Sequence, residues 1–186
     1  MAVVIRRRGS GLPGSLGITR VLAIGATVLA ALALQSTLLA RLTILGVIPQ
    51  LTLVVIVAFA YLDGERVGIV IGFCGGLLLD LLIPQSIVGL HALVYTLIGY
   101  SVGAFAQYAP TESVWLPVLS VALATAAAEF SYAALSIILG QPWVSIEVTA
   151  KLAGLVVLYN TLLTPLTFPL LKRIADRFRP ERVFRG

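Results

Sequence analysis

Charged side chains are scarce in this sequence. They make up 11% of the 186 residues, whereas hydrophobic residues make up 59%. A soluble domain carries about 25% charged residues because it needs a hydrated surface. The composition therefore excludes an ordinary soluble domain. The length fits one domain in which about six helices of about 20 residues each cross a bilayer.

Cysteine and histidine each occur once. One cysteine cannot form a disulfide framework, and we expect Cys74, which lies in an apolar run, to be a small buried side chain. The chain has no Walker A sequence, no His-Glu-x-x-His sequence and no cysteine–histidine spacing typical of a metal site. The sequence therefore indicates neither a metal nor another cofactor.

The few charges, together with prolines and glycines, divide the chain into six apolar stretches. We predict an all-α integral membrane protein, a six-helix transmembrane bundle, with a membrane domain at residues 20–171 between basic tails at 1–19 and 172–186. The first five predicted spans are residues 20–41, about 45–62, 67–83, 87–107 and 114–139. The sixth follows the turn at 140–142 and runs to about 171.

The basic residues predict the orientation, because positive charge is retained on the cytoplasmic side. With six spans, every lysine and arginine except Arg41 and Lys151 falls on one side, together with both termini. Trp115 and Trp143 then lie at opposite interfaces, where indoles prefer to be. The net charge of +5 is concentrated at the two ends of the chain, which favours membrane lipid rather than nucleic acid as its counterpart. We therefore predict a multi-pass protein with cytoplasmic termini.

Two strings resemble catalytic motifs but lack the required setting. Residues 9–14 fit G-x-G-x-x-G, yet no strand precedes them and a proline lies inside. Residues 99–103 fit the G-x-S-x-G nucleophile elbow, which needs a strand-to-helix turn and not the middle of a span. On one helix, His91 and Ser101 would be about 15 Å apart along the axis. The sequence does not indicate an enzyme.

Glycines recur at four-residue spacing in two predicted spans, which is typical of closely packed membrane helices. They are Gly68, Gly72 and Gly76 in the third span and Gly99 and Gly103 in the fourth. Such surfaces serve either internal packing or the binding of a partner's helix. We predict that the third span faces inward and that the fourth presents its glycines to a partner.

Four ionisable or polar side chains lie within the spans, where they require partners. Asp80 and His91 are expected at similar depth on either side of a turn, so they either bond to each other or satisfy backbone and water. Glu129 and Lys151 are also expected at matching depth, although Glu147 competes for Lys151 as an i,i+4 pair. These groups either hold helices together or mark an ion pathway.

Further polar groups in the first and sixth spans favour hydrogen bonding between helices, and Pro165 and Pro169 favour a kink. The carboxyl-terminal tail combines Ile174 and Phe178 with basic residues. That pattern predicts a short interfacial helix on anionic lipid, or a docking site for a cytoplasmic partner. The basic residues of this tail are Lys172, Arg173, Arg177 and Arg179.

Several stretches between residues 49 and 103 form a recognisable pattern. They are Pro49-Gln50-Leu51, Gly72-Phe73, Gly76-Leu77-Leu78-Leu79-Asp80-Leu81-Leu82, Ser86-Ile87-Val88-Gly89-Leu90-His91-Ala92-Leu93 and Gly99-Tyr100. Together they resemble the bacterial rod shape-determining protein MreD family. One position departs from the expected pattern, because His91 stands where we expect asparagine or a similar polar residue.

The resemblance implies a non-catalytic subunit of the cell-elongation machinery in the bacterial cytoplasmic membrane. It implies binding to the single-span protein MreC, and work beside MreB, RodA and a class B penicillin-binding protein in lateral peptidoglycan synthesis. It also implies a fold resembling the S components of energy-coupling factor transporters. The alternative function is therefore a substrate-binding S component, with Asp80, His91, Glu129 and Lys151 around an outward pocket.

Overall fold

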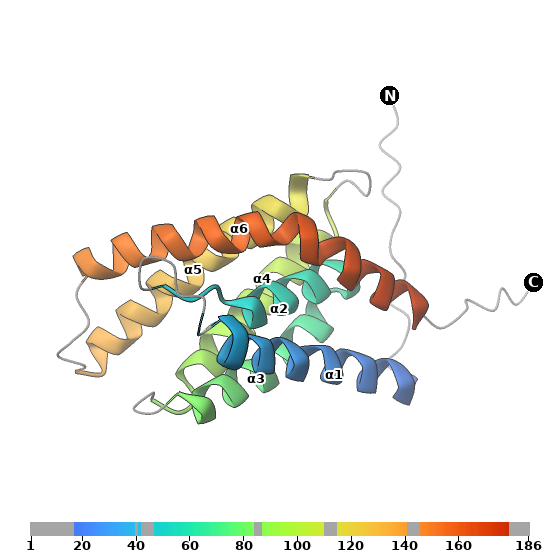
Figure 1. Ribbon diagram of the computed structural model, residues 1–186, viewed down its shortest axis with the longest axis horizontal. Coiled ribbons are helices and arrows are strands. Elements are labelled where there is room, and N and C mark those ends of the chain that lie inside the picture. The colour runs from blue at the N-terminus through green and yellow to red at the C-terminus, as the bar shows by residue number, and fades with distance from the viewer. Residues whose placement is uncertain are drawn as a thin grey trace, which may run out of the picture.

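The computed structural model describes residues 17–39, 41, 47–83, 87–109, 115–140 and 146–178. The regular elements in this part of the chain are helices. Their arrangement is shown in Figure 1. The all-α class and the six α-helices predicted from the sequence are confirmed. The elements are α1 (Ile18–Leu34), the π-helical turn η1 (Gln35–Leu39), α2 (Leu51–Asp63), α3 (Glu65–Leu82), α4 (Leu90–Ala106), α5 (Trp115–Ile138) and α6 (Ile146–Arg177).

The helices differ in length. Three described segments are long and apolar enough to cross a membrane, namely Ile18–Leu39, Trp115–Ile138 and Thr149–Arg177. Helices α2 and α4 are apolar but have only 13 and 17 residues. Helix α3 has 18 residues and includes Glu65, Arg66 and Asp80. At 1.5 Å per residue, α2 extends for only about 20 Å, so it is shorter than the hydrocarbon core of about 30 Å.

Helix α2 forms the centre of the bundle. Residues 53–60 are all buried, and α2 contacts each of the other five α-helices. A helix that is hydrophobic on all sides suits such a position. The prediction that this span begins near residue 45 is wrong, because helix starts at Leu51. Pro49 disfavours helical geometry at the residue before it, and the N–H of Gln50 is bonded to a side chain of α6.

The glycines of α3 and α4 face one another. Gly68 packs on the backbone of Gly99, and Gly103 packs on the backbone of Glu65. A Cβ placed on Gly76 would lie 2.5 Å from the carbonyl oxygen of His91. The prediction that Gly99 and Gly103 face a partner is therefore wrong, since both glycine sets serve one internal interface. Helix–helix approach at this distance requires glycine on both surfaces.

Two glycines set the connections at the ends of α3 and α4. Gly64 alone separates α2 from α3 and has φ of 94°, a conformation that glycine adopts without a steric cost. Gly89 precedes α4 and has φ of 99°. Near the first of these turns, the guanidinium of Arg20 forms an ion pair with Asp63, and both side chains are almost fully buried. The pair joins the start of α1 to the end of α2, and it was not predicted from the sequence.

The outside of the bundle is apolar. Leu158, Leu162, Leu166 and Leu170 of α6 are each more than half exposed at four-residue spacing. Such a continuous apolar surface is matched by lipid rather than by water. Cys74 is exposed on this outer surface, so the prediction of a buried cysteine is wrong. Its apolar neighbours in the sequence indicated an apolar environment, which here is the outer face of α3.

Helix α6 continues beyond the predicted end of its span. It runs to Arg177 and contains Pro165 and Pro169, and Figure 1 shows its second half turning away from the direction of the first. Leu171 and Ala175 are buried in the core cluster. The predicted short interfacial helix is therefore the last part of α6, packed against the bundle. The side chains of Lys172, Arg173 and Arg177 are exposed there, whereas Arg179 and Trp143 lie outside the described residues.

The α3–α4 interface leads to a first prediction. Gly72→Leu places a side chain against the backbone of Tyr95, so the helices must separate. We expect destabilisation at or above the upper end of the ~1–3 kcal/mol that overpacking costs, with less folded protein in the membrane. Gly154→Leu is the control, because nothing lies within 4 Å of a Cβ at that position. Equal thermal unfolding of both variants in detergent would contradict the interface.

Candidate functional site

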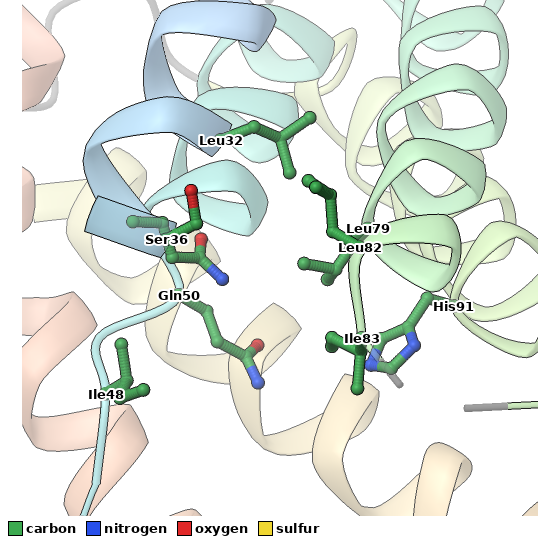
Figure 2. Close-up of a pocket in the computed structure, with 9 residues that line it drawn as sticks. Leu32, Ser36, Ile48, Gln50, Leu79, Leu82, Ile83 and His91 are labelled. Carbon is green, nitrogen blue, oxygen red and sulfur yellow. The ribbon is translucent and has the colours of Figure 1, made fainter. Parts of the chain in front are cut away.

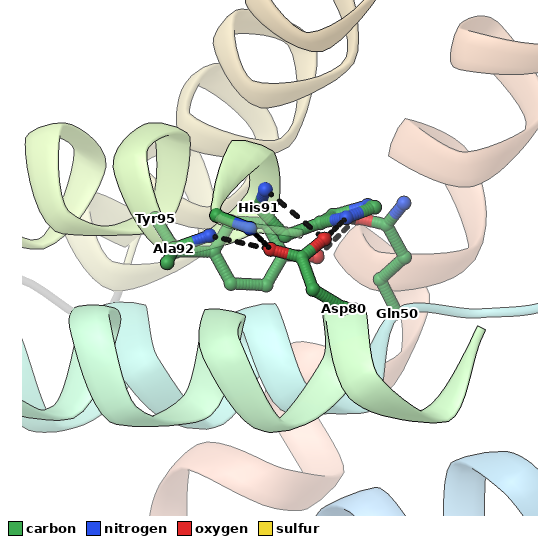
Figure 3. A network of polar contacts seen from close by, with 6 residues as sticks. Gln50, Asp80, His91, Ala92 and Tyr95 are labelled. Carbon is green, nitrogen blue, oxygen red and sulfur yellow. Dashed lines mark hydrogen bonds and ion pairs between the residues drawn. The ribbon is translucent and has the colours of Figure 1, made fainter. Parts of the chain in front are cut away.

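Asp80 lies in the last turns of α3 and points at the start of α4 (Figure 3). Its carboxylate accepts hydrogen bonds from the backbone N–H groups of Gly89 at 2.9 Å and of His91 and Ala92, both at 3.3 Å. It also contacts Nδ1 of His91 at 2.6 Å. The side chain of Asp80 is completely buried. Asp80 is therefore bonded on both oxygens.

These bonds supply an N-terminal cap for α4. The first N–H groups of a helix have no partner within it, and Gly89 at the N-cap has no side chain to offer. Asp80 provides the acceptor from the neighbouring helix, and a carboxylate at this end also suits the helix dipole. The sequence left two alternatives open, a bond to His91 or bonds to backbone, and both are present.

The ring of His91 is fixed on several sides. It packs edge-on against the ring of Tyr95, with centroids 5.6 Å apart, and lies tilted at 34° to the ring of Tyr132, with centroids 4.2 Å apart. Because the carboxylate of Asp80 already accepts backbone N–H groups, it acts as an acceptor, and Nδ1–H of His91 is the donor. In neutral imidazole, Nε2 is then an acceptor. Among the described residues no hydrogen bond reaches Nε2.

Helix α2 is capped in the same way by side chains from other elements. The N–H of Gln50 donates to Oδ1 of Asn160 on α6 at 3.0 Å. The N–H of Thr52 donates to Oε1 of Gln35 at 2.9 Å. Gln35 is the first residue of η1, the π-helical turn that ends the first span. Helices α2 and α4 both begin inside the bundle, and side chains of other elements accept the hydrogen bonds of their first backbone N–H groups.

The side chain of Gln50 connects these groups. Its Nε2 donates to the carboxylate of Glu129 on α5, and its Oε1 accepts from the hydroxyl of Tyr95 at 3.3 Å. Behind it, Nδ2 of Asn160 donates to the hydroxyl of Thr125 at 3.1 Å. We call this group the polar centre. Its members are Gln35, Gln50, Asp80, His91, Tyr95, Thr125, Glu129 and Asn160.

Three of the four polar residues singled out in the sequence meet in the polar centre: Asp80, His91 and Glu129. Lys151 is exposed in an early turn of α6, and the side chain of Glu147 lies outside the described part. Gln50, Tyr95 and Thr125 are the members to which the sequence analysis assigned no hydrogen-bonding role. A signal existed for Gln50, since it is a polar residue beside Pro49 at the start of an apolar run.

A cavity of about 250 Å³ lies in front of the polar centre (Figure 2). Leu32, Leu79, Gln35, Gln50 and His91 line its inner part and are buried or half-buried, whereas Ser36, Ile48, Leu82 and Ile83 are exposed at its mouth. The cavity thus has polar groups inside and a mostly apolar entrance.

The described residues do not form the catalytic arrangements that the sequence motifs suggested. Residues 99–103 lie inside α4, and the hydroxyl of Ser101 donates to the carbonyl of Leu97 at 2.8 Å. Ser101 is therefore not on a nucleophile elbow. No group of three or more His, Cys, Asp or Glu side chains within the described ranges is arranged to hold a metal ion. The polar centre offers hydrogen bonds that join helices.

These features define an α-helical membrane protein whose internal polar groups fasten its helices together. The chain belongs to the family described as rod shape-determining protein MreD, because the model of that family matches residues 17–174. No curated protein and no solved structure matches. The match extends the resemblance seen in residues 49–103 to most of the chain. Family membership indicates a role in determining rod shape.

The caps lead to a second prediction. Asp80→Leu removes the acceptor for three N–H groups and for His91, so we expect a loss of about 3–5 kcal/mol, as for a broken buried pair. Asp80→Asn should cost less because one amide oxygen still accepts. Ser101→Leu is the control on an exposed face of α4. If Asp80→Leu is as stable as the wild type when the two proteins are unfolded in detergent, the carboxylate does not hold the start of α4 in place.

Proposed function

We propose that this protein is a non-catalytic scaffold subunit of the bacterial cell-elongation machinery, and that it binds the transmembrane helix of MreC and supports lateral peptidoglycan synthesis. The observation that carries the proposal is the family match over residues 17–174. MreB, RodA and a class B penicillin-binding protein are the further members of this assembly. The inner arrangement supports a scaffold, since its polar groups bond to one another and to helix ends.

The contact with MreC requires a surface on which a second helix can pack closely, because lipid offers no hydrophobic drive for association. The glycines of α3 and α4 are already used inside the bundle. The small residues on the outer face of α1, in contrast, are not packed against other described helices. Ala26, Ala30 and Ala33 are exposed there, and a Cβ on Gly25 would meet nothing within 4 Å.

Helix α1 also has a suitable position in the bundle. Its opposite face, with Ile24, Val28 and Leu32, is buried in the core, and the small residues lie on the outer face beside the exposed Leu22 and Leu29. We therefore assign the MreC contact to the face made by Gly25, Ala26, Ala30 and Ala33, and call it the small-residue face of α1. This replaces the fourth span as the partner surface.

The proposed setting is the cytoplasmic membrane, with six spans and both termini in the cytoplasm. The buried pair of Arg20 and Asp63 supports the antiparallel arrangement of the first two spans, because it joins the start of α1 to the end of α2. The exposed Lys172, Arg173 and Arg177 near the end of α6 suit the anionic lipid of the cytoplasmic leaflet.

The third prediction tests partner binding. Ala26→Leu and Ala33→Leu add bulk on the small-residue face of α1, where they should abolish co-purification with MreC without lowering the amount of folded protein. Gly154→Leu is a matched control, being an equally open small-to-large change on α6. If MreC is retained by both α1 variants, the small-residue face is not its seat. Loss of MreC in the Gly154 variant alone would move the contact to α6.

The fourth prediction tests topology. Reporter domains fused after Gly186 and inserted next to Ser86 should lie on opposite sides of the membrane, with the carboxyl-terminal reporter in the cytoplasm. Sidedness is read from reporter activity or from labelling of intact cells. A periplasmic carboxyl terminus would contradict the six-span arrangement.

A further inference from the structure

The cavity in front of the polar centre combines two kinds of wall. Its inner part brings together His91, Gln50 and Gln35, and its mouth is formed mainly by the exposed apolar side chains of Ile48, Leu82 and Ile83 (Figure 2). A molecule that fills it must therefore place a polar end inside and keep an apolar part at the entrance. This is the arrangement of an amphiphile that enters with its polar end first.

The free hydrogen-bonding positions limit the chemistry of that polar end. Nδ1 of His91 is used by Asp80, which leaves Nε2 as an acceptor with no partner among the described residues. Gln50 donates one N–H to Glu129 and accepts from Tyr95, so its second N–H remains to donate. A hydroxyl group satisfies both positions, since it can donate to His91 and accept from Gln50.

Charge and size restrict the ligand further. None of the nine described residues that line the cavity is a lysine or an arginine, and the carboxylates of Asp80 and Glu129 lie directly behind His91 and Gln50. An anionic group is therefore disfavoured. The volume of about 250 Å³ corresponds to about eight water molecules. That space holds a head group and the first part of a chain, rather than a complete lipid.

We propose that this cavity is a binding site for a neutral, hydroxyl-bearing amphiphile, with its hydroxyl between His91 and Gln50 and its apolar chain passing Leu82 and Ile83. The site lies between α1 and α3 and shares no residue with the small-residue face, although Ser36 at its mouth donates a hydrogen bond to the carbonyl of Ala33. The test of this site uses no partner protein, so its outcome does not depend on whether the small-residue face binds MreC. The ligand comes either from the bilayer or from the aqueous phase, and the chemistry is the same in both cases.

His91 is the only histidine in the chain, so it gives a single, unambiguous signal. The experiment uses the full chain in lipid nanodiscs with ¹⁵N-labelled histidine, and 1-dodecanol is the probe. We expect a saturable shift of the Nε2 resonance toward lower frequency, with Nδ1 nearly unchanged, because a hydroxyl donates to Nε2. Dodecane, which has the same chain without a hydroxyl, should leave Nε2 in place.

Two further arms complete the test. Ser36→Phe fills the mouth of the cavity and should abolish the dodecanol shift, while an unchanged Nδ1 signal without probe shows that the Asp80–His91 bond persists. Water-soluble 1-butanol should act only if the site takes ligands from the aqueous phase. No response to either alcohol, an equal response to dodecane, or a full response in the Ser36 variant would each overturn the proposal.

Discussion

The structure depends on one constraint: two of its helices begin inside the bundle. An unbonded backbone N–H in an apolar medium costs several kcal/mol, and the start of each helix has such groups. Helix α4 receives its acceptor from Asp80, and α2 receives acceptors from Asn160 and Gln35. The caps come from three other elements, so the fold of each short helix requires its neighbours. The short helices therefore require the polar side chains in the core, because those side chains bond to the helix starts.

The glycine interface and the caps support each other. Close packing of α3 on α4 along Gly68, Gly72 and Gly76 brings the end of α3 against the start of α4. Only at that distance can the carboxylate of Asp80 reach the N–H groups of Gly89 and Ala92. The chain belongs to a family of rod shape-determining proteins, and a bundle packed in this way suits the scaffold role proposed for it.

Much of this was readable in the sequence, because lipid imposes strong rules on composition. Six helices, the importance of Asp80 and the close-packing role of the glycines followed from apolar runs, charge and spacing. The sequence did not reveal which element each glycine-containing face contacts. Spacing shows that residues 99 and 103 share a face, but only the tertiary packing shows that this face meets α3. The short α2 and the bonds of Gln50 were likewise hidden, since an apolar run does not reveal where its helix begins.

The central claim is that side chains from other helices cap α2 and α4 inside the membrane. Amide hydrogen exchange in lipid nanodiscs tests it most directly, residue by residue. The account predicts that the N–H groups of Thr52 and Ala92 exchange as slowly as those in the middle of α2, although neither is bonded within its own helix. Exchange at those positions as fast as at the exposed turn residue Val88 would contradict it, because the helix starts would then be bonded to water.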